Sequence, residues 1–222
     1  MGGMIPLGDV SRRTRFPVVT TLVILVNVYV FLLELAGGNR FVHAWSVIPM
    51  RITHGEHTVT LVTSMFLHGG WMHIIGNMVF LWAFGPAIED AMGHAPFAIF
   101  YLTGGVTAML AQVLGDPHST IPCLGASGAI AAVMGAFIVT FPRDRIRTLL
   151  FFLIFIRVTY IPALFLIGFW FLMQILNFGA VAEVRTGGVA YLAHIAGFLF
   201  GVVTARVFED PRRIALRRSI NG

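Results

Sequence analysis

The stretch that decides the fold class is Pro17–Ala36, which reads PVVTTLVILVNVYVFLLELA. Its 20 residues include a single charged side chain, that of Glu34. A transmembrane helix needs about 20 consecutive, mainly apolar residues to cross the hydrocarbon core of a bilayer. The stretch therefore predicts a spanning helix, and it is too long for the apolar region of a cleavable signal peptide.

The composition of the whole chain agrees with a membrane protein. Of its 222 residues, 57% are hydrophobic and 11% are charged, whereas a soluble domain carries about 25% charged residues. The net charge of +5 does not indicate nucleic-acid binding, because the basic residues lie in short clusters between apolar runs. The single cysteine, Cys123, excludes an internal disulfide.

Five more apolar segments are candidates for spanning helices. They are Trp71–Ile88, Pro96–Leu114, Ala126–Phe141, Ile161–Phe178 and Gly188–Phe208. We therefore predict an all-α, polytopic membrane protein with six transmembrane helices over residues 17–208. This domain lies between a polar N-terminal tail, residues 1–16, and an Arg-rich C-terminal tail, residues 209–222. The apolar stretch Thr148–Ile156 is too short to span, so we expect it to lie in the membrane interface.

The arginines predict the orientation. With the N-terminus in the cytoplasm, twelve of the fifteen arginines fall in the tails and loops on the cytoplasmic side. Short loops rich in Arg and Lys stay on that side of the membrane. We therefore expect both termini in the cytoplasm. The long first outer loop, Gly37–Gly70, is apolar enough to lie in the interface.

Few polar side chains lie inside the predicted helices, and four of them fall at a similar depth. His73 and Asn77 are four residues apart at the start of the second helix, so they share one helix face. Ser127 begins the fourth helix, and His194 lies near the start of the sixth. Polar groups are costly in lipid, and this convergence marks a candidate functional site near the outer face.

The surroundings of Ser127 suit a nucleophile. It lies in Gly125-Ala126-Ser127-Gly128, where a helix start offers free backbone N–H groups and a positive dipole. Small residues form a stripe on each of the two helices, and such stripes allow close packing. The stripes are Ser127, Ala131 and Gly135 on the fourth helix, and Ala190, His194, Gly197 and Gly201 on the sixth. Packing them together would bring the His194 imidazole to the Ser127 hydroxyl, as a general base requires.

Each of these residues also has an ordinary structural interpretation. A serine at a helix start is usually an N-cap, and a histidine in a membrane helix often only satisfies a neighbouring polar group. His68 and His73 could be interfacial residues or metal ligands, and Gly197 with Gly201 could serve packing alone. The conjunction of these residues at one depth favours the catalytic interpretation over any residue taken singly.

The chain resembles the rhomboid intramembrane serine proteases. The matching motifs are His73-Ile-Ile-Gly-Asn77, Gly125-Ala-Ser127-Gly128 and Ala193-His194-Ile-Ala-Gly197-Phe-Leu-Phe-Gly201. Their order and their placement on the second, fourth and sixth helices are similar to the six-helix form of bacteria and archaea. The resemblance covers about residues 15 to 208.

The resemblance implies a role for each motif residue. Ser127 would be the nucleophile and His194 the general base, with no third acid. Asn77, His73 and the backbone N–H of Ser127 would form the oxyanion hole. The glycines would shape the Ser127 loop and allow close helix packing; they are Gly125, Gly128, Gly197 and Gly201. The fifth helix, with the loop Gly179–Gly187, would form a lateral gate or cap.

Two positions depart from the family pattern. Many members carry Trp-Arg in the first outer loop, where this chain has Val59-Thr60. Some members stack a Tyr beneath the catalytic His, four residues after the serine, where this chain has Ala131. Some other group must therefore orient His194.

The sequence thus predicts an intramembrane serine endopeptidase that needs no metal and no cofactor. Its expected partners are the transmembrane segments of substrate proteins and the lipid bilayer, with no nucleic acid. Its expected location is the plasma membrane of a bacterial or archaeal cell. A catalytically silent relative that binds membrane proteins is the first alternative, and a small transporter is the second. The oligomeric state stays open.

Overall fold

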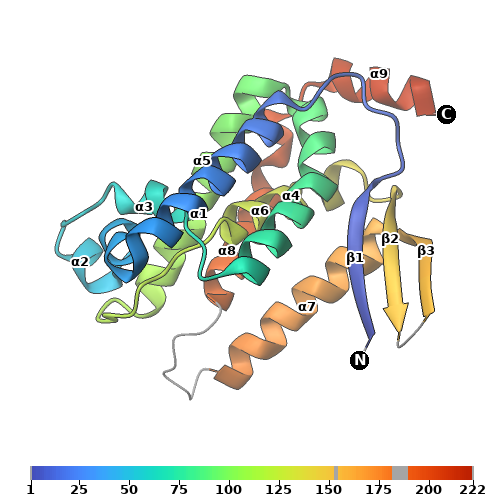
Figure 1. The fold of residues 1–222 in the computed structure, drawn as a ribbon. Helices are drawn as coiled ribbons and strands as arrows, with labels where there is room; N and C mark the ends of the chain where they lie inside the picture. Colours follow the sequence, from blue (N-terminus) through green and yellow to red (C-terminus); the bar gives the residue numbers. More distant parts are fainter. Residues whose placement is uncertain (1, 153–154, 182–189, 222) are drawn as a thin grey trace.

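Six apolar helices form a bundle, with short helices at one end and a small sheet at one side (Figure 1). The computed structural model describes residues 2–152, 155–181 and 190–221. The elements in chain order are β1 (Gly2–Asp9), α1 (Val18–Trp45), α2 (Pro49–Thr53), α3 (Thr60–Thr63), the 3-10 helix η1 (Ser64–Phe66), α4 (Trp71–Met92), α5 (His94–Gly115), α6 (Ser127–Thr140), β2 (Arg145–Phe152), β3 (Phe155–Pro162), α7 (Ala163–Val181), α8 (Tyr191–Phe208) and α9 (Pro211–Asn221).

The predicted multi-pass helical architecture is confirmed. Among the described helices, α1, α4, α5 and α8 are long and apolar enough to cross a membrane, while α6 and the Ala163–Phe178 part of α7 are apolar but shorter. Helix α6 lies in the middle of the bundle, and its residues from Gly128 to Phe137 are all buried. Its 14 residues extend for about 21 Å, less than the bilayer core. Ser127, its first residue, is half-buried.

The first outer loop, Gly37–Gly70, is largely helical. Helix α1 continues past Ala36, through a kink where Gly38 has a φ of 59°, and ends at Trp45. Helices α2, α3 and η1 then follow beside the end of the bundle where α6 begins (Figure 1), which we call the Ser127 end. Val47 and Cys123 exchange two backbone hydrogen bonds of 3.0 and 2.7 Å, and this bridge ties the loop to the segment that leads into Ser127.

A three-stranded antiparallel sheet is the feature that the sequence interpretation missed. The strands lie in the order β1-β2-β3, and β1 packs against α4. The stretch Thr148–Ile156, expected to be a simple interfacial segment, instead contributes to β2 and β3. The expected N-terminal tail likewise contains β1, in which Gly2 pairs with Phe152 and Asp9 with Ile146. Pairing within the sheet satisfies backbone groups that an unpaired apolar segment would leave open.

Helices α6 and α8 pack directly on each other, as predicted, but the contact uses a different stripe on α6. A Cβ at Gly197 would collide with the carbonyl oxygen of Gly128, and one at Gly201 with that of Ala132. The α6 stripe is therefore Gly128, Ala132 and Gly135, displaced by one residue from the predicted stripe over its first two positions. Glycine is required here because the backbones leave no room for a side chain.

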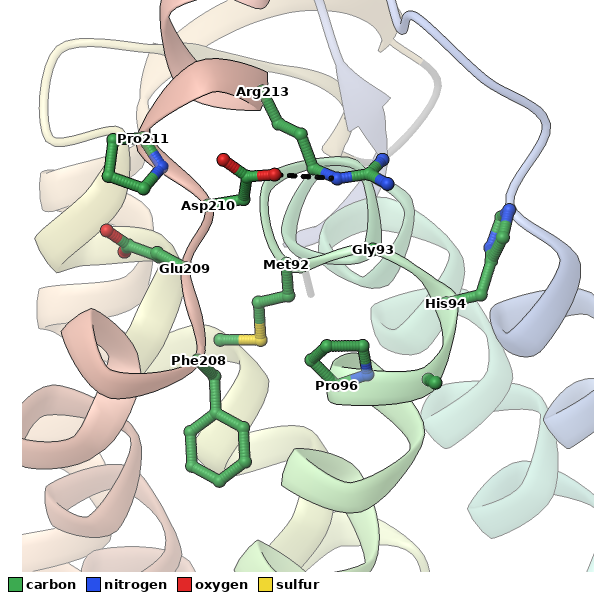
Figure 2. A pocket seen from close by; sticks show the side chains of 10 residues that line it. Met92, Gly93, His94, Pro96, Phe208, Glu209, Asp210, Pro211 and Arg213 are labelled. Atoms are coloured by element: carbon green, nitrogen blue, oxygen red, sulfur yellow. Dashed lines mark ion pairs between the residues drawn. The ribbon is translucent and has the colours of Figure 1, made fainter.

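The opposite end of the bundle, which we call the α9 end, holds an open pocket. Figure 2 shows the turn between α4 and α5, at Gly93, facing the segment between α8 and α9. The Nε atom of Arg213 lies 3.4 Å from a carboxylate oxygen of Asp210 beside this pocket. Its lining includes Met92 and Phe208, the last residues of α4 and α8, so it is remote from the residues at the start of α6.

Candidate active site

Ser127 and His194 meet, as the sequence predicted. The Ser127 Oγ and the His194 Nε2 are 2.7 Å apart, a hydrogen-bond distance. Ser127 is the first residue of α6, and His194 lies in the first turn of α8. The glycine contacts between the two helices bring these backbones together, and His194 is buried. A serine hydroxyl and a buried imidazole at this distance can form a nucleophile and general-base pair.

A third side chain continues this pair, and sequence reasoning did not find it. The His194 Nδ1 lies 2.8 Å from the Oε1 of Gln174, a buried residue of α7. Gln174 is therefore the side chain that contacts the other ring nitrogen of His194. The Trp170 ring, one turn earlier on α7, lies 5.7 Å from the imidazole between centroids. Ala131 is also buried but carries no aromatic ring.

Asn77 is the first candidate donor for an oxyanion. Its side chain is 9% exposed, and its Nδ2 has no hydrogen-bond partner within the described part of the chain. An unpaired buried amide destabilises a fold. An open donor near a nucleophile is what an oxyanion hole needs, because the charge that it stabilises exists only during the reaction.

His73 is the second candidate, and its contacts indicate its tautomer. The backbone N–H of Gly69 donates to the His73 Nδ1 over 3.2 Å, so that nitrogen accepts and the proton of a neutral ring lies on Nε2. The Nε2 atom lies 3.1 Å from the position that a Cβ of Gly125 would occupy. Gly125 has a φ of +125°, which only glycine readily adopts, and it lets the His73 ring lie against the Ser127 loop.

The backbone at the start of α6 supplies further donors. The first helical bond runs from the N–H of Ile130 to the carbonyl of Ala126, over 3.0 Å. The N–H groups of Ser127, Gly128 and Ala129 precede it, at the positive end of the helix dipole. The loop is held in place because Gly125 donates its N–H to the carbonyl oxygen of Ser64 over 2.9 Å. Ser64 is a further positioning residue that carried no motif signal.

Ser127, His194 and His73 thus lie together at the start of α6. His68 packs edge-on against His73, with ring centroids 5.1 Å apart, and its N–H donates to Glu34 over 2.9 Å. Burial lowers the pKa of His68 to about 3, so this ring is neutral. The predicted cap, Gly179–Gly187, reaches into residues 182–189, which lie outside the described residues. The gate expectation therefore concerns α7 alone.

Comparison with known proteins identifies the family. The rhomboid domain matches residues 55–210, more than half of the chain. The chain is 29% identical over 185 residues to the mitochondrial rhomboid protein 1 of Saccharomyces cerevisiae, covering 80% of this chain and 49% of that protein. It is 29% identical over 204 residues to the rhomboid protease GluP of Bacillus subtilis, covering 88% of this chain and 36% of that protein.

A human relative matches over a shorter region. The mitochondrial presenilin-associated rhomboid-like protein of Homo sapiens is 33% identical over 88 residues, which cover 39% of this chain and 23% of that protein. The chain spans about half or less of each of these relatives. From the extent of the domain match and the helical bundle together, the chain belongs to the rhomboid family.

Proposed function

We propose that the protein is an intramembrane serine endopeptidase. It cleaves peptide bonds in or next to the transmembrane helices of other membrane proteins. The observation that carries the proposal is the 2.7 Å contact between the Ser127 Oγ and the His194 Nε2. The His194 imidazole of this pair is buried, and a buried polar group in a membrane protein is costly unless it has a use. The similarity to the GluP protease supports the same activity.

The reaction follows from the positions of these atoms. The Ser127 Oγ attacks the carbonyl carbon of the scissile bond while its proton passes to the His194 Nε2. The resulting imidazolium donates that proton to the leaving amine nitrogen, and the C–N bond breaks to leave an acyl ester on Ser127. Water, deprotonated by His194, then attacks the acyl carbon of the ester. The bond from this carbon to the Ser127 Oγ breaks, His194 returns the proton to the Oγ, and the carboxylic acid product leaves. Activity should rise with pH, because only the neutral imidazole can accept the proton.

A negative charge forms on the carbonyl oxygen of the tetrahedral intermediate, and it needs hydrogen-bond donors that face this oxygen. The Nδ2 of Asn77, the Nε2 of His73 and the backbone N–H of Ser127 supply them. These donors are held before the substrate arrives, and such preorganisation is the main source of electrostatic stabilisation in enzymes.

The substrate must unwind locally before Ser127 can reach its backbone. Gly and Pro lower the cost of that step, by about 1 and 3 kcal/mol relative to Ala in a helix interior. We propose that both termini face the cytoplasm of a bacterial or archaeal cell and that the protein lies in its plasma membrane. Cleavage then occurs near the outer end of the substrate helix.

The direct test uses purified protein in liposomes with a model type-I membrane substrate whose cleavage region contains Gly and Pro. Wild-type protein should release two fragments with a cut near the outer end of the helix, as measured by mass spectrometry. Ser127→Ala should release none. A serine-reactive fluorophosphonate should label the wild type only. If wild-type protein neither cleaves nor reacts, the silent membrane-protein-binding alternative is favoured instead.

A further inference from the structure

The buried amide of Gln174 lies between helix α7 and the imidazole of His194. Its Oε1 is 2.8 Å from the His194 Nδ1, and its Nε2 is 3.1 Å from the carbonyl oxygen of Trp170. No motif singled out Gln174, and the dyad mechanism does not require it. A polar side chain that is 7% exposed in a mainly apolar helix needs a reason for its presence.

The contacts determine which way the amide points. The Trp170 carbonyl can only accept a hydrogen bond, so the atom that faces it must be the NH₂ group of Gln174. The oxygen of the same amide therefore faces His194. Since an amide oxygen only accepts, the His194 Nδ1 must carry a proton. This chain of hydrogen bonds begins at the Trp170 carbonyl oxygen, an acceptor that helix α7 holds in place.

The proton on Nδ1 sets the state of the other ring nitrogen. In a neutral imidazole with Nδ1 protonated, Nε2 carries a lone pair and accepts from the Ser127 hydroxyl at 2.7 Å. The other tautomer would place a hydrogen between Nε2 and Oγ, and the imidazole could not act as a base. Gln174 thus selects the tautomer that the reaction needs, without a charged group.

We propose that Gln174 is the positioning residue of the catalytic base. It holds His194 in the Nδ1-protonated tautomer and fixes its ring orientation, and this role rests on the proposed protease function. Gln174 lies on α7, whose described contacts are mainly with α8. A movement of α7 away from α8 would therefore release the acceptor and weaken the base. The position of this helix and the readiness of the dyad are coupled through one hydrogen bond.

The test compares two variants. Gln174→Leu removes the acceptor oxygen at similar side-chain volume, whereas Gln174→Glu keeps an acceptor oxygen, now that of a carboxyl group. The control is Ile175→Ala on the same helix, whose side chain is 45% exposed. We expect Gln174→Leu to lower kcat about 10- to 100-fold, with KM changed less than threefold, because an unmet hydrogen bond at a buried polar group has an effect of this size. Gln174→Glu should recover most of the lost kcat, and Ile175→Ala should match the wild type.

A second measurement reads the tautomer without activity. The ring ¹⁵N shifts of His194, assigned by difference from His194→Ala, should show Nδ1 protonated and Nε2 unprotonated in the wild type. They should show a mixture in Gln174→Leu. Unchanged shifts and unchanged kcat in an active Gln174→Leu protein would overturn the inference. If the wild-type protein itself is inactive, the proposed function is overturned. The ¹⁵N shifts would still decide whether Gln174 selects the tautomer.

Discussion

The two ends of the bundle each bury a group of polar side chains, but they bond them differently. At the α9 end, the carboxylate of Glu89 accepts hydrogen bonds from the N–H groups of Val19 and Thr20, over 2.7 and 2.8 Å. His94 lies 2.6 Å from the same carboxylate. The first-turn donors of α1 are thus capped by a side chain of α4, which joins the two helices.

A second group at this end joins the termini to the bundle. The guanidinium of Arg217 on α9 pairs with Asp9 at the end of β1, and with Asp144 over 3.2 Å. Burial raises the pKa of Asp9, and the charge of Arg217 opposes that shift. Asp90 likewise binds the backbone N–H of Thr14 over 3.0 Å. Every carboxylate in this group has a partner.

The Ser127 end is different because several of its polar atoms are open. Within the described residues, the Nδ2 of Asn77, both ring nitrogens of His68 and the Oγ of Ser64 are buried without a hydrogen-bond partner. Open polar atoms reduce stability, whereas capped ones support it. The comparison therefore separates polar groups that hold the fold from polar groups that the fold leaves unpaired, and mutations at the two ends should have different consequences.

The largest expected effect is the loss of the dyad. Ser127→Ala and His194→Ala should each lower proteolysis by about 10⁴-fold or more, as in other serine enzymes, while the protein keeps its fold. The double variant should lose little more than either single variant, because the two residues act as a unit. The measurement is initial cleavage rates in liposomes. If the rate loss of the double variant equals the product of the two single losses, the dyad is contradicted. Near wild-type cleavage by Ser127→Ala would show that the Ser127 end is not catalytic.

Removal of an open donor should have the next largest effect. Asn77→Ala should lower kcat by about 10- to 1,000-fold, because the other donors of the oxyanion hole remain. KM should change little, and stability should not fall, since the Asn77 Nδ2 has no hydrogen-bond partner among the described residues. Steady-state kinetics and thermal melting check both statements. An increase in KM alone would make Asn77 a substrate contact instead.

Separation of α6 from α8 should affect both activity and stability. In Gly201→Val, the new side chain meets the carbonyl oxygen of Ala132 and pushes the helices apart. A shift near 1 Å can lower the rate about 100-fold. Gly168→Val is the matched control, because a Cβ at Gly168 meets nothing within 4 Å. Equal rates and equal melting temperatures for both variants would show that this stripe does not position His194.

The smallest effect on the chemistry is expected at the α9 end. Arg217→Met leaves Asp9 and Asp144 without their partner and should destabilise the protein by about 3–5 kcal/mol. The cleavage rate per folded molecule should stay close to wild type, because Arg217 contacts no group of the dyad. Thermal melting and active-site titration separate the two quantities, with the exposed Arg218→Met as control. A large fall in the rate per folded molecule would mean that the two ends are coupled.

Local patterns in the sequence predicted most of the fold. The six apolar segments each correspond to a helix, and their ends differ from the predicted ones by a few residues, apart from α1, which extends to Trp45. The strands were missed because the run Thr148–Ile156 is short and apolar throughout, and such a run has no period that separates strand from helix. Its strands are defined by pairing: β2 pairs with β3, and also with β1, more than 130 residues away in the chain.

The sequence by itself determined that this is a helical membrane protein, and it predicted that His73, Asn77, Ser127 and His194 converge at one depth. Polar residues within apolar segments and small residues at helical spacing can be recognised in the sequence, because each depends only on residues close together in the chain. Tertiary structure decided the α6 stripe, the cap that Glu89 places on α1, and the partner of His194. Gln174 lies 20 residues from His194 in sequence. Nothing along the chain relates the two, because only the packing of α7 on α8 determines which acceptor faces the imidazole.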